Sequence, residues 1–424
     1  PAPPRPAPPP AAVASVKDAA KGKGDAKAKS AQRSGPQPLA LHITEASIGA
    51  HTVFFDDPEH ALDPFYSALA ALAWGERDKV RIRHYGDSHI ANDGTTHALR
   101  VLLQRRFGEG GHGFVLAKAR TRWYKHKGIK HVASDGFTVR NFLGGGVPDG
   151  AFGYGGVAAS GGKGQSLRVE TVKEGMGASI SSLELFYRAI GPARIAVTAD
   201  GKRLDDLVIP SAKGDGFNRW TLPEGPHRFR LRIRQGKVRL FGMVAERDRG
   251  LVYDSLGVVG ARASRWLNVR AVHLHEQFQH RPTDLVVFNY GGNSRNDKTK
   301  KERYTDRFAK VIQRLRPNPK EACLVIGPSD HGVRKRGKIL SDPKTMRLIE
   351  WQRETALAND CAFLDARAVM GGDGAMGRWV AQGLGWHDHA HFTPKGMATM
   401  GTAIYAAFLQ GLRDYLVRDK APPP

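Results

Sequence analysis

Hydrophobic and polar residues alternate with different periods along this chain. Apolar residues recur at helical spacing over residues 61–74, and residues 80–85 then alternate as a half-buried strand does. A second helical stretch over residues 97–107 ends in the glycine-rich run 108–113. A strand, a turn and a helix in this order predict the opening of an α/β domain.

The centre of the chain changes to short alternating runs that are separated by Gly, Pro and Asp. These runs cover residues 166–172, 182–189, 193–198 and 227–234. The tripeptide Ala199-Asp200-Gly201 lies between two of them and is typical of a hairpin turn. We therefore predict an all-β domain, a sandwich, over residues 113–249.

The α/β rhythm resumes after residue 250. Strand-like runs cover residues 251–253, 284–289, 323–327 and 362–364, and the stretches between them are typical of helices. Because the runs are nearly continuous in Val, Ile, Leu and Phe, we expect parallel strands that are covered on both faces. One α/β domain over residues 39–112 and 250–419 is therefore predicted to be interrupted by the β-sandwich.

Both ends of the chain are rich in proline. Residues 1–38 consist largely of Pro, Ala, Lys and Gly, which cannot bury enough apolar surface to offset the entropy of ordering, so a disordered tail is predicted. Residues 420–424 form a second Pro-rich tail. The first residue is Pro rather than Met. Removal of a secretion signal or a cloning boundary produces such an end, and we expect the first, with the protein in the periplasm, the cell envelope or outside the cell.

The composition is that of a globular protein with anionic partners. Its 424 residues are 41% hydrophobic, and 65 Lys and Arg against 41 Asp and Glu give a net charge of +24. Such a charge favours binding to an anionic polymer. No zinc-finger or RNP-type aromatic pattern accompanies it, so no specific nucleic-acid recognition is expected. No apolar run reaches the roughly 18 residues of a membrane span, so no transmembrane segment is predicted.

Polar motifs follow four of the predicted strands. They are Gly86-Asp87-Ser88-His89, residues 254–260 (Asp-Ser-Leu-Gly-Val-Val-Gly), residues 290–293 (Tyr-Gly-Gly-Asn) and residues 388–396 (Asp-His-Ala-His-Phe-Thr-Pro-Lys-Gly). In open parallel sheets, functional groups gather at the carboxyl ends of the strands. We therefore expect the four motifs to meet at one edge of the sheet.

These motifs supply the groups that acyl transfer needs. A serine nucleophile requires an imidazole to take its proton and a carboxylate to orient that imidazole, which Ser88, His391 and Asp388 provide. The oxyanion formed in the reaction requires preorganised donors. The backbone amides of Ser88 and Gly260 and the side-chain amide of Asn293 are the candidates. This chemistry needs neither a cofactor nor a metal ion, and none is expected.

The ordered set Ser88, Gly260, Asn293 and Asp388 with His391 resembles the SGNH hydrolase family, also called GDSL esterases. The resemblance implies a flavodoxin-like three-layer α/β/α fold, with Ser88 as the nucleophile. His89 stands where many relatives have Leu, and Ser294 stands where an acidic residue is frequent. The motifs are most similar to an exported bacterial branch related to peptidoglycan O-acetylesterases. In that branch a β-sandwich resembling a carbohydrate-binding module interrupts the catalytic domain.

The resemblance implies a serine esterase that removes O-acetyl groups from a polysaccharide, with cell-wall peptidoglycan or another anionic wall polymer as the leading substrate. One alternative is an O-acetyltransferase that uses the same triad. The other is a wall-binding protein with a vestigial esterase core. The sequence does not indicate an oligomeric state.

Several residues outside the motifs are candidates for further roles. Aromatic residues of the insert offer flat faces for stacking on sugar rings or serve as core; these are Trp123, Tyr124, Tyr154, Phe186, Tyr187 and Trp220. Arg228, Arg230, Arg232 and Arg234 share one face of an alternating strand, which is either solvated or faces an anionic polymer.

The only two cysteines are Cys323 and Cys361, so a four-cysteine zinc site is excluded. Cys323 and Cys361 lie four residues before Gly327 and Asp365, which mark the ends of two predicted strands, and if those strands are neighbours the two sulfurs start level. A disulfide and two buried free thiols both fit this spacing.

Overall fold

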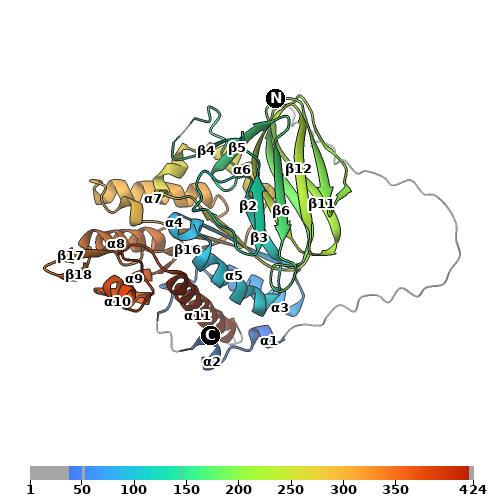
Figure 1. Ribbon diagram of the computed structural model, residues 1–424. Helices are drawn as coiled ribbons and strands as arrows, with labels where there is room; N and C mark the ends of the chain where they lie inside the picture. The colour runs from blue at the N-terminus through green and yellow to red at the C-terminus, as the bar shows by residue number, and fades with distance from the viewer. Residues whose placement is uncertain (1–37, 50–52, 145, 420–424) are drawn as a thin grey trace, which may run out of the picture. The chain divides into compact units, whose positions relative to one another are not determined.

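A five-stranded parallel sheet lies at the centre of the α/β part of the chain (Figure 1). The computed structural model describes residues 38–49, 53–144 and 146–419, so the predicted tails lie outside the described residues apart from Pro38. The spatial order of the strands is β14 (Gly250–Gly257), β1 (Lys79–Gly86), β15 (Leu285–Asn289), β16 (Ala322–Ile326) and β19 (Ala362–Leu364). Counted along the chain within this sheet, the order is 2-1-3-4-5, which is the flavodoxin-like order. The predicted fold class is confirmed.

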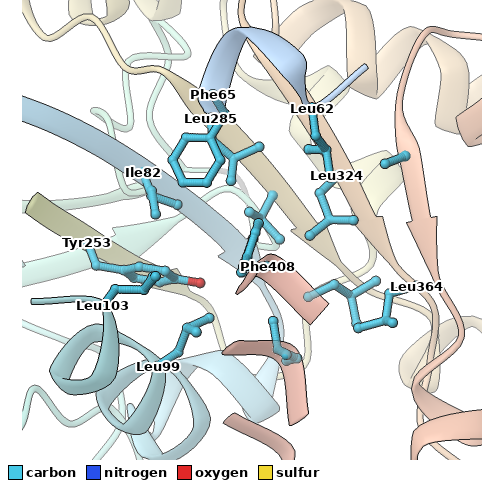
Figure 2. Close-up of a cluster of buried hydrophobic side chains, with 14 of the residues drawn as sticks. Leu62, Phe65, Ile82, Leu99, Leu103, Tyr253, Leu285, Leu324, Leu364 and Phe408 are labelled. Atoms are coloured by element: carbon cyan, nitrogen blue, oxygen red, sulfur yellow. The ribbon is translucent and has the colours of Figure 1, made fainter. Parts of the chain in front are cut away.

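Helices cover both faces of this sheet. One face packs against α3 (Asp63–Trp74), α5 (Gly94–Phe107) and α11 (Pro394–Asp419), and the other packs against α6 (Ala271–His280), α7 (Lys301–Leu315) and α8 (Pro343–Leu357). Alternation along β1 explains the two layers, because Val80 and Ile82 point into the first core and Tyr85 points into the second. Figure 2 shows the first core, where Phe65 and Phe408 from two helices approach Leu285 of the sheet.

The inserted strands form two antiparallel six-stranded sheets. One consists of β2 (Gly111–Leu116), β4 (Thr138–Asn141), β5 (Val157–Gly162), β7 (Ile180–Ala189), β11 (Gly214–Gly225) and β13 (Lys237–Glu246). The other consists of β3 (Ile129–Ala133), β6 (Ser166–Thr171), β8 (Ala193–Ala199), β9 (Lys202–Arg203), β10 (Leu207–Ile209) and β12 (Arg228–Gln235). Alternate residues of the two sheets interdigitate in a shared core, for example Phe229, Leu231 and Ile233 of β12.

The predicted hairpin turn at residues 199–201 joins β8 to β9, with φ angles of 52° at Asp200 and 82° at Gly201. The limits of 113–249 for the insert remain a prediction. The remaining elements are α1 (Pro38–Leu41), α2 (Glu45–Ile48), α4 (Ser88–Ala91), η1 (Ala263–Asn268), η2 (Gly292–Ser294), β17 (Gly332–Lys335), β18 (Lys338–Ser341), α9 (Ala366–Val369) and α10 (Ala375–Ala381). No helix among the described residues is long and apolar enough to cross a membrane.

The sandwich is joined to the parallel sheet by a common core and by buried charges. Phe114 and Phe186 of the sandwich pack in the same cluster as Leu256 of β14. Glu246, at the end of β13, forms ion pairs of 2.8 Å with Lys79 and 2.7 Å with Arg281. Burial raises the pKa of Glu246, but the neighbouring cations outweigh this effect and hold it far below its ordinary value.

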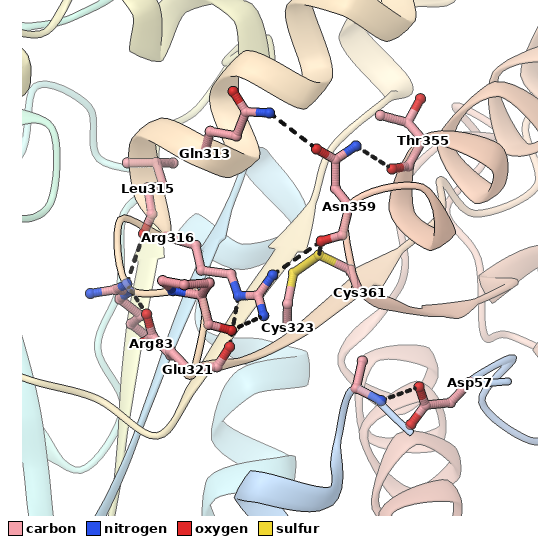
Figure 3. Close-up of a disulfide and its surroundings, with 12 residues drawn as sticks. Asp57, Arg83, Gln313, Leu315, Arg316, Glu321, Cys323, Thr355, Asn359 and Cys361 are labelled. Carbon is pink, nitrogen blue, oxygen red and sulfur yellow. Dashed lines mark hydrogen bonds and ion pairs between the residues drawn. A yellow bond between two sulfur atoms is a disulfide. The ribbon is translucent and has the colours of Figure 1, made fainter. Parts of the chain in front are cut away.

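Cys323 and Cys361 form a disulfide between neighbouring parallel strands (Figure 3). Both residues are buried, and each directly precedes a paired position of β16 and β19, since Leu324 pairs with Ala362. The two sulfurs are therefore level, as the spacing of the cysteines from their strand ends suggests. Such a bond persists in an oxidising compartment.

Removing the disulfide should destabilise the protein. The bond closes a loop with a sequence separation of 38 residues, and the loss of this constraint on the unfolded chain costs about 4 kcal/mol. We expect Cys323→Ala/Cys361→Ala to lower the free energy of unfolding by about that amount in urea titrations. The wild type should lose similar stability in dithiothreitol, whereas the variant should not respond to the reductant. An unchanged wild-type midpoint after complete reduction would contradict this prediction.

Several histidines are buried in the uncharged form. Burial lowers the pKa of His84 to about 3. Burial and the charge of Arg100 lower the pKa of His112 to about 4. In the unfolded chain a histidine titrates near 6.5. At a pH between the lowered pKa of a buried histidine and 6.5, that histidine binds a proton only in the unfolded chain. The stability that is present above pH 6.5 is therefore lost as the pH falls toward 4.

The variant His112→Gln should reduce this acid sensitivity. The Nε2–H of His112 donates to the carbonyl of Gly177 at 2.8 Å, and a glutamine amide retains a donor. Each neutral buried histidine contributes a slope of about 1.4 kcal/mol per pH unit below its unfolded pKa. We expect urea titrations between pH 6 and 4.5 to give a slope smaller by about that amount in the variant. Equal slopes in the two proteins would show that His112 is already protonated in the folded state.

Candidate active site

The short helix α4 carries Ser88 at its first position and lies directly on the ends of two strands. Gly86 and Gly257 are register partners at the ends of β1 and β14. A Cβ on Gly86 would overlap the side chain of Ile90, and a Cβ on Gly257 would overlap the backbone of Ala91. Glycine at both positions therefore allows α4 to approach the sheet, and this contact sets the height of Ser88 above it.

Ser88, His391 and Asp388 form a chain of hydrogen bonds. The Oγ of Ser88 lies 3.1 Å from Nε2 of His391, and Nδ1 of His391 lies 2.7 Å from Oδ2 of Asp388. The carboxylate can only accept, so Nδ1 carries the proton and Nε2 is free to accept from Ser88. The structure thus brings together three predicted residues that are up to 303 positions apart. The side chain of His391 is 43% exposed, so the chain of bonds opens to the surface.

The turn that holds His391 is built by Asp388. One oxygen of its carboxylate accepts from the backbone N–H groups of Ala390 and His391, both at 3.0 Å. Partial burial raises the pKa of Asp388, but these bonds and the imidazole of His391 lower it by more, so it lies below its ordinary value. Asp388 is therefore ionised at neutral pH and available to orient the imidazole.

The predicted oxyanion donors differ in their availability. The backbone N–H groups of Ser88 and Gly260 have no hydrogen-bond partner among the described residues. Gly260 is exposed and has a φ of 79°, and no atom lies within 4 Å of the position that a Cβ would take. The amide of Asn293 instead donates to Oδ2 of Asp87 at 3.1 Å and to the carbonyl of Ala261 at 3.2 Å. Asn293 therefore links the segments that follow β1, β14 and β15 in this structure.

His89 has a structural role that sequence reasoning missed. Its Nδ1 lies 3.3 Å from a carboxylate oxygen of Asp87 and its Nε2 lies 3.1 Å from the carbonyl of Ala390. Both partners only accept, so an imidazolium satisfies both contacts. Burial lowers the pKa of His89, but the hydrogen bond and charge of Asp87 and the carbonyl of Ala390 raise it by more. Its ring stacks on that of His391 with centroids 5.2 Å apart.

His89 therefore connects α4 to the turn that carries His391. The position was identified as a departure from the Leu of many relatives. The hydrogen-bonding capacity of a histidine beside the nucleophile was the available signal, but the sequence does not show which carbonyl it meets.

Most of the candidate sugar-stacking residues belong to the core. Tyr154 and Phe186 have no exposed surface, and Trp220 is 7% exposed. Tyr187 is also buried and Tyr124 is half-buried. Trp123, at 63% exposure, is the member of the set that presents its ring to solvent. Trp386, which sequence reasoning missed, is 51% exposed, and its backbone N–H donates to the carbonyl of His391.

The other candidate groups are arranged as follows. The four arginines of β12 are exposed, and Arg228 pairs with Glu170. Asp215, His273 and Glu276 lie close enough to one another to share an ion. However, Nδ1 of His273 is bonded to Asp215, its Nε2 accepts from Gly153, and Asp215 also pairs with an arginine. Protein contacts therefore already use the ligand atoms of Asp215 and His273.

Comparisons with known proteins identify a similar family model and similar solved structures. Residues 234–399 match the model of the GDSL-like lipase/acylhydrolase family. The chain is also similar to the solved structure of a peptidoglycan O-acetylesterase, with a TM-score of 0.73 and 21% identity over 85% of this chain and 99% of that chain. A family two carbohydrate esterase from Cellvibrio japonicus matches with a TM-score of 0.26 and 13% identity over 68% and 99% of the two chains. No curated protein sequence matches significantly.

These comparisons bear on two expectations. The family match confirms the predicted resemblance to GDSL esterases and supports a carboxylic ester hydrolase. The likeness to the O-acetylesterase, at 21% identity, shows a shared fold.

Replacing His89 should impair ester hydrolysis without unfolding the protein. The variant His89→Leu removes the contact with Ala390 and the ring that stacks on His391, so the imidazole of His391 is less well positioned. We expect kcat on an aryl acetate to fall about tenfold with a small change in KM, since misplacement of a reacting group by a fraction of an ångström has effects of this size.

The pH profile distinguishes this role from simple packing. In His89→Leu the acid limb of the kcat profile should move to higher pH, because the variant removes the cationic ring that stacks on His391 while the carboxylate of Asp87 remains. The variant His89→Gln keeps one donor toward Ala390 and should recover part of kcat while keeping the displaced limb. A lower kcat with an unmoved acid limb would contradict the electrostatic part of the prediction.

Proposed function

We propose that this protein is a serine esterase that removes O-acetyl groups from a polysaccharide, with cell-wall peptidoglycan as the leading substrate. The observation that carries the proposal is the chain of hydrogen bonds from Ser88 through His391 to Asp388, open at the surface. The match to GDSL-like acylhydrolases supports the reaction class. The fold shared with a peptidoglycan O-acetylesterase supports the choice of substrate class.

In this proposal, Ser88 is the nucleophile. Its Oγ attacks the acetyl carbonyl carbon while His391 accepts the hydroxyl proton at Nε2. Collapse of the tetrahedral intermediate breaks the bond to the sugar oxygen, which leaves with the proton from His391, and the acetyl group stays on Ser88. A water molecule then attacks this ester, His391 again takes and returns a proton, and acetate departs. Asp388 keeps the imidazole oriented through both steps.

The oxyanion of each intermediate is stabilised by backbone donors. In this proposal the N–H groups of Ser88 and Gly260, which have no hydrogen-bond partner among the described residues, supply two of the donors. Asn293 supplies a third when its amide turns away from Asp87 or Ala261, to which it donates in this structure.

A polymeric substrate agrees with the position of the triad. The side chains of His391 and Asp388 are 43% and 50% exposed, so an ester on a long chain reaches them without entering a deep cavity. The disulfide between Cys323 and Cys361 agrees with an exported protein, because cytosolic thiols are kept reduced.

Acetate release tests the proposal directly. We expect the wild type to release acetate from O-acetylated peptidoglycan and Ser88→Ala to lose more than about 1,000-fold in kcat, because the nucleophile is absent. The exposed Ser211 of the insert offers a matched control, and Ser211→Ala should behave as the wild type. Circular dichroism spectra of the variants verify the fold.

Other outcomes identify the alternatives. Turnover of an aryl acetate without release from the glycan would keep the esterase and exclude this substrate. Transfer of acetyl groups to added sugar acceptors in excess of hydrolysis would indicate an O-acetyltransferase. Binding to the glycan with no turnover in either protein would indicate a wall-binding protein.

A further inference from the structure

The loop between β2 and β3 gathers positive charge and an exposed aromatic ring. Residues 110–134 contain six Lys or Arg and no Asp or Glu. Within them, residues 120–127 form a segment that we name the basic arm. Its four cations are exposed and form no ion pair with any described residue; they are Arg120, Arg122, Lys125 and Lys127. The ring of Trp123 is 63% exposed, and the guanidinium of Arg122 lies 5.4 Å from its centroid.

The basic arm is attached beside the nucleophile. The backbone N–H of Lys125 donates to the carbonyl of Ala91 in α4 at 2.9 Å, and that of Lys127 donates to the carboxylate of Asp93 at 2.7 Å. Ala91 lies three residues after Ser88 in the same helix, which corresponds to about 5 Å along the axis. The point of attachment of the arm therefore lies about one helical turn from Ser88.

The arm is held in one orientation from its inner side. The phenol of Tyr124 accepts from the backbone N–H of Leu116 at 3.1 Å, and its ring packs against the core shared by the sandwich and the parallel sheet. His126 is buried. The inward residues Tyr124 and His126 thus alternate with the outward Trp123, Lys125 and Lys127, after a turn that the backbone hydrogen bond from Tyr124 to Thr121 closes at 3.4 Å. These inward contacts hold the backbone of the arm in place.

We propose that the basic arm is the substrate-binding element of this protein and that its substrate is a carboxylate-bearing polysaccharide. The inference rests on the proposed esterase function, whose site it extends. Cations without partners in the protein pair with carboxylates spaced along a glycan chain. The face of Trp123 packs against the apolar face of a sugar ring. A neutral glycan would use the ring and leave the cations without partners.

The charge of the arm can be removed without touching the proposed triad. We expect Arg120→Gln/Arg122→Gln/Lys125→Gln to raise KM about tenfold for O-acetylated alginate, which carries uronate carboxylates, and for O-acetylated peptidoglycan, which carries peptide carboxylates. The ratio of kcat/KM for these polymers to that for neutral acetylated xylan should fall by a similar factor. The wild-type ratio should decrease with added salt, because exposed charges are screened, and the variant ratio should stay nearly constant.

The exposed face of β12 supplies a control with the same change in charge. Arg230, Arg232 and Arg234 are exposed on the outer face of the sandwich. Arg230→Gln/Arg232→Gln/Arg234→Gln should leave both the polymer ratio and its salt dependence as in the wild type. Equal effects of the two triple variants would assign the preference to net charge and overturn the role of the arm.

Binding without turnover separates this inference from the proposed function. In a Ser88→Ala background, cosedimentation with de-O-acetylated peptidoglycan and retardation on alginate gels should weaken about tenfold when the three arm cations are removed. This result would support the arm even if the wild type released no acetate. An unchanged affinity would overturn the inference while leaving the esterase proposal intact. Tighter binding to single-stranded DNA than to either glycan, with the same dependence on the arm, would also overturn it in favour of a nucleic-acid surface.

Discussion

The close contact between α4 and the ends of β1 and β14 determines where all the other groups of the site must lie. Gly86 and Gly257 are paired across the two strands, and neither position has room for a Cβ. With the helix seated at this height, Asp87 caps its first turn and Ser88 faces the turn that carries His391. Any side chain on either glycine would lift the helix. This would separate the Oγ of Ser88 from Nε2 of His391, which lie 3.1 Å apart.

Around this contact, Asp87 acts as a centre of hydrogen bonds rather than as a reacting group. It accepts from His89 on one side and from the amide of Asn293 on the other. These bonds join the strand-end motifs of β1 and β15, and Asn293 extends the connection to Ala261 beyond β14. The proposed nucleophile, oxyanion donors and general base are therefore coupled through one buried carboxylate. The insertion of a whole sandwich between β1 and β14 does not disturb this network, because the two strands still pair over eight consecutive positions.

The cations that make up the large positive charge fall into two groups, those paired inside the protein and those exposed without a partner among the described residues. Many arginines of the described chain form ion pairs with carboxylates of the protein. One example is Arg281, which pairs with both Asp254 and Glu246 in a buried site that joins the sandwich to the parallel sheet. Such cations stabilise the tertiary structure and are not available to a ligand. The cations of the basic arm have no such partner among the described residues, and they lie next to the helix that carries Ser88. The net charge of +24 thus includes cations that are paired inside the protein and the exposed cations of the basic arm, which we propose bind the substrate.

The sequence alone determined the strand periods, the α/β class with its inserted sandwich and the four motifs that contain Ser88, Asp388 and His391. These features are local, because periodicity and motif spacing depend on residues a few positions apart. Only the tertiary structure decided that His89 meets Ala390, that Asn293 donates to Asp87, and that Tyr154 and Phe186 are core while Trp123 is exposed. The sequence pattern of an alternating strand is the same whether its aromatic residues face the core or the solvent. Its burial, like the meeting of residues some 300 positions apart, is set by which elements pack together.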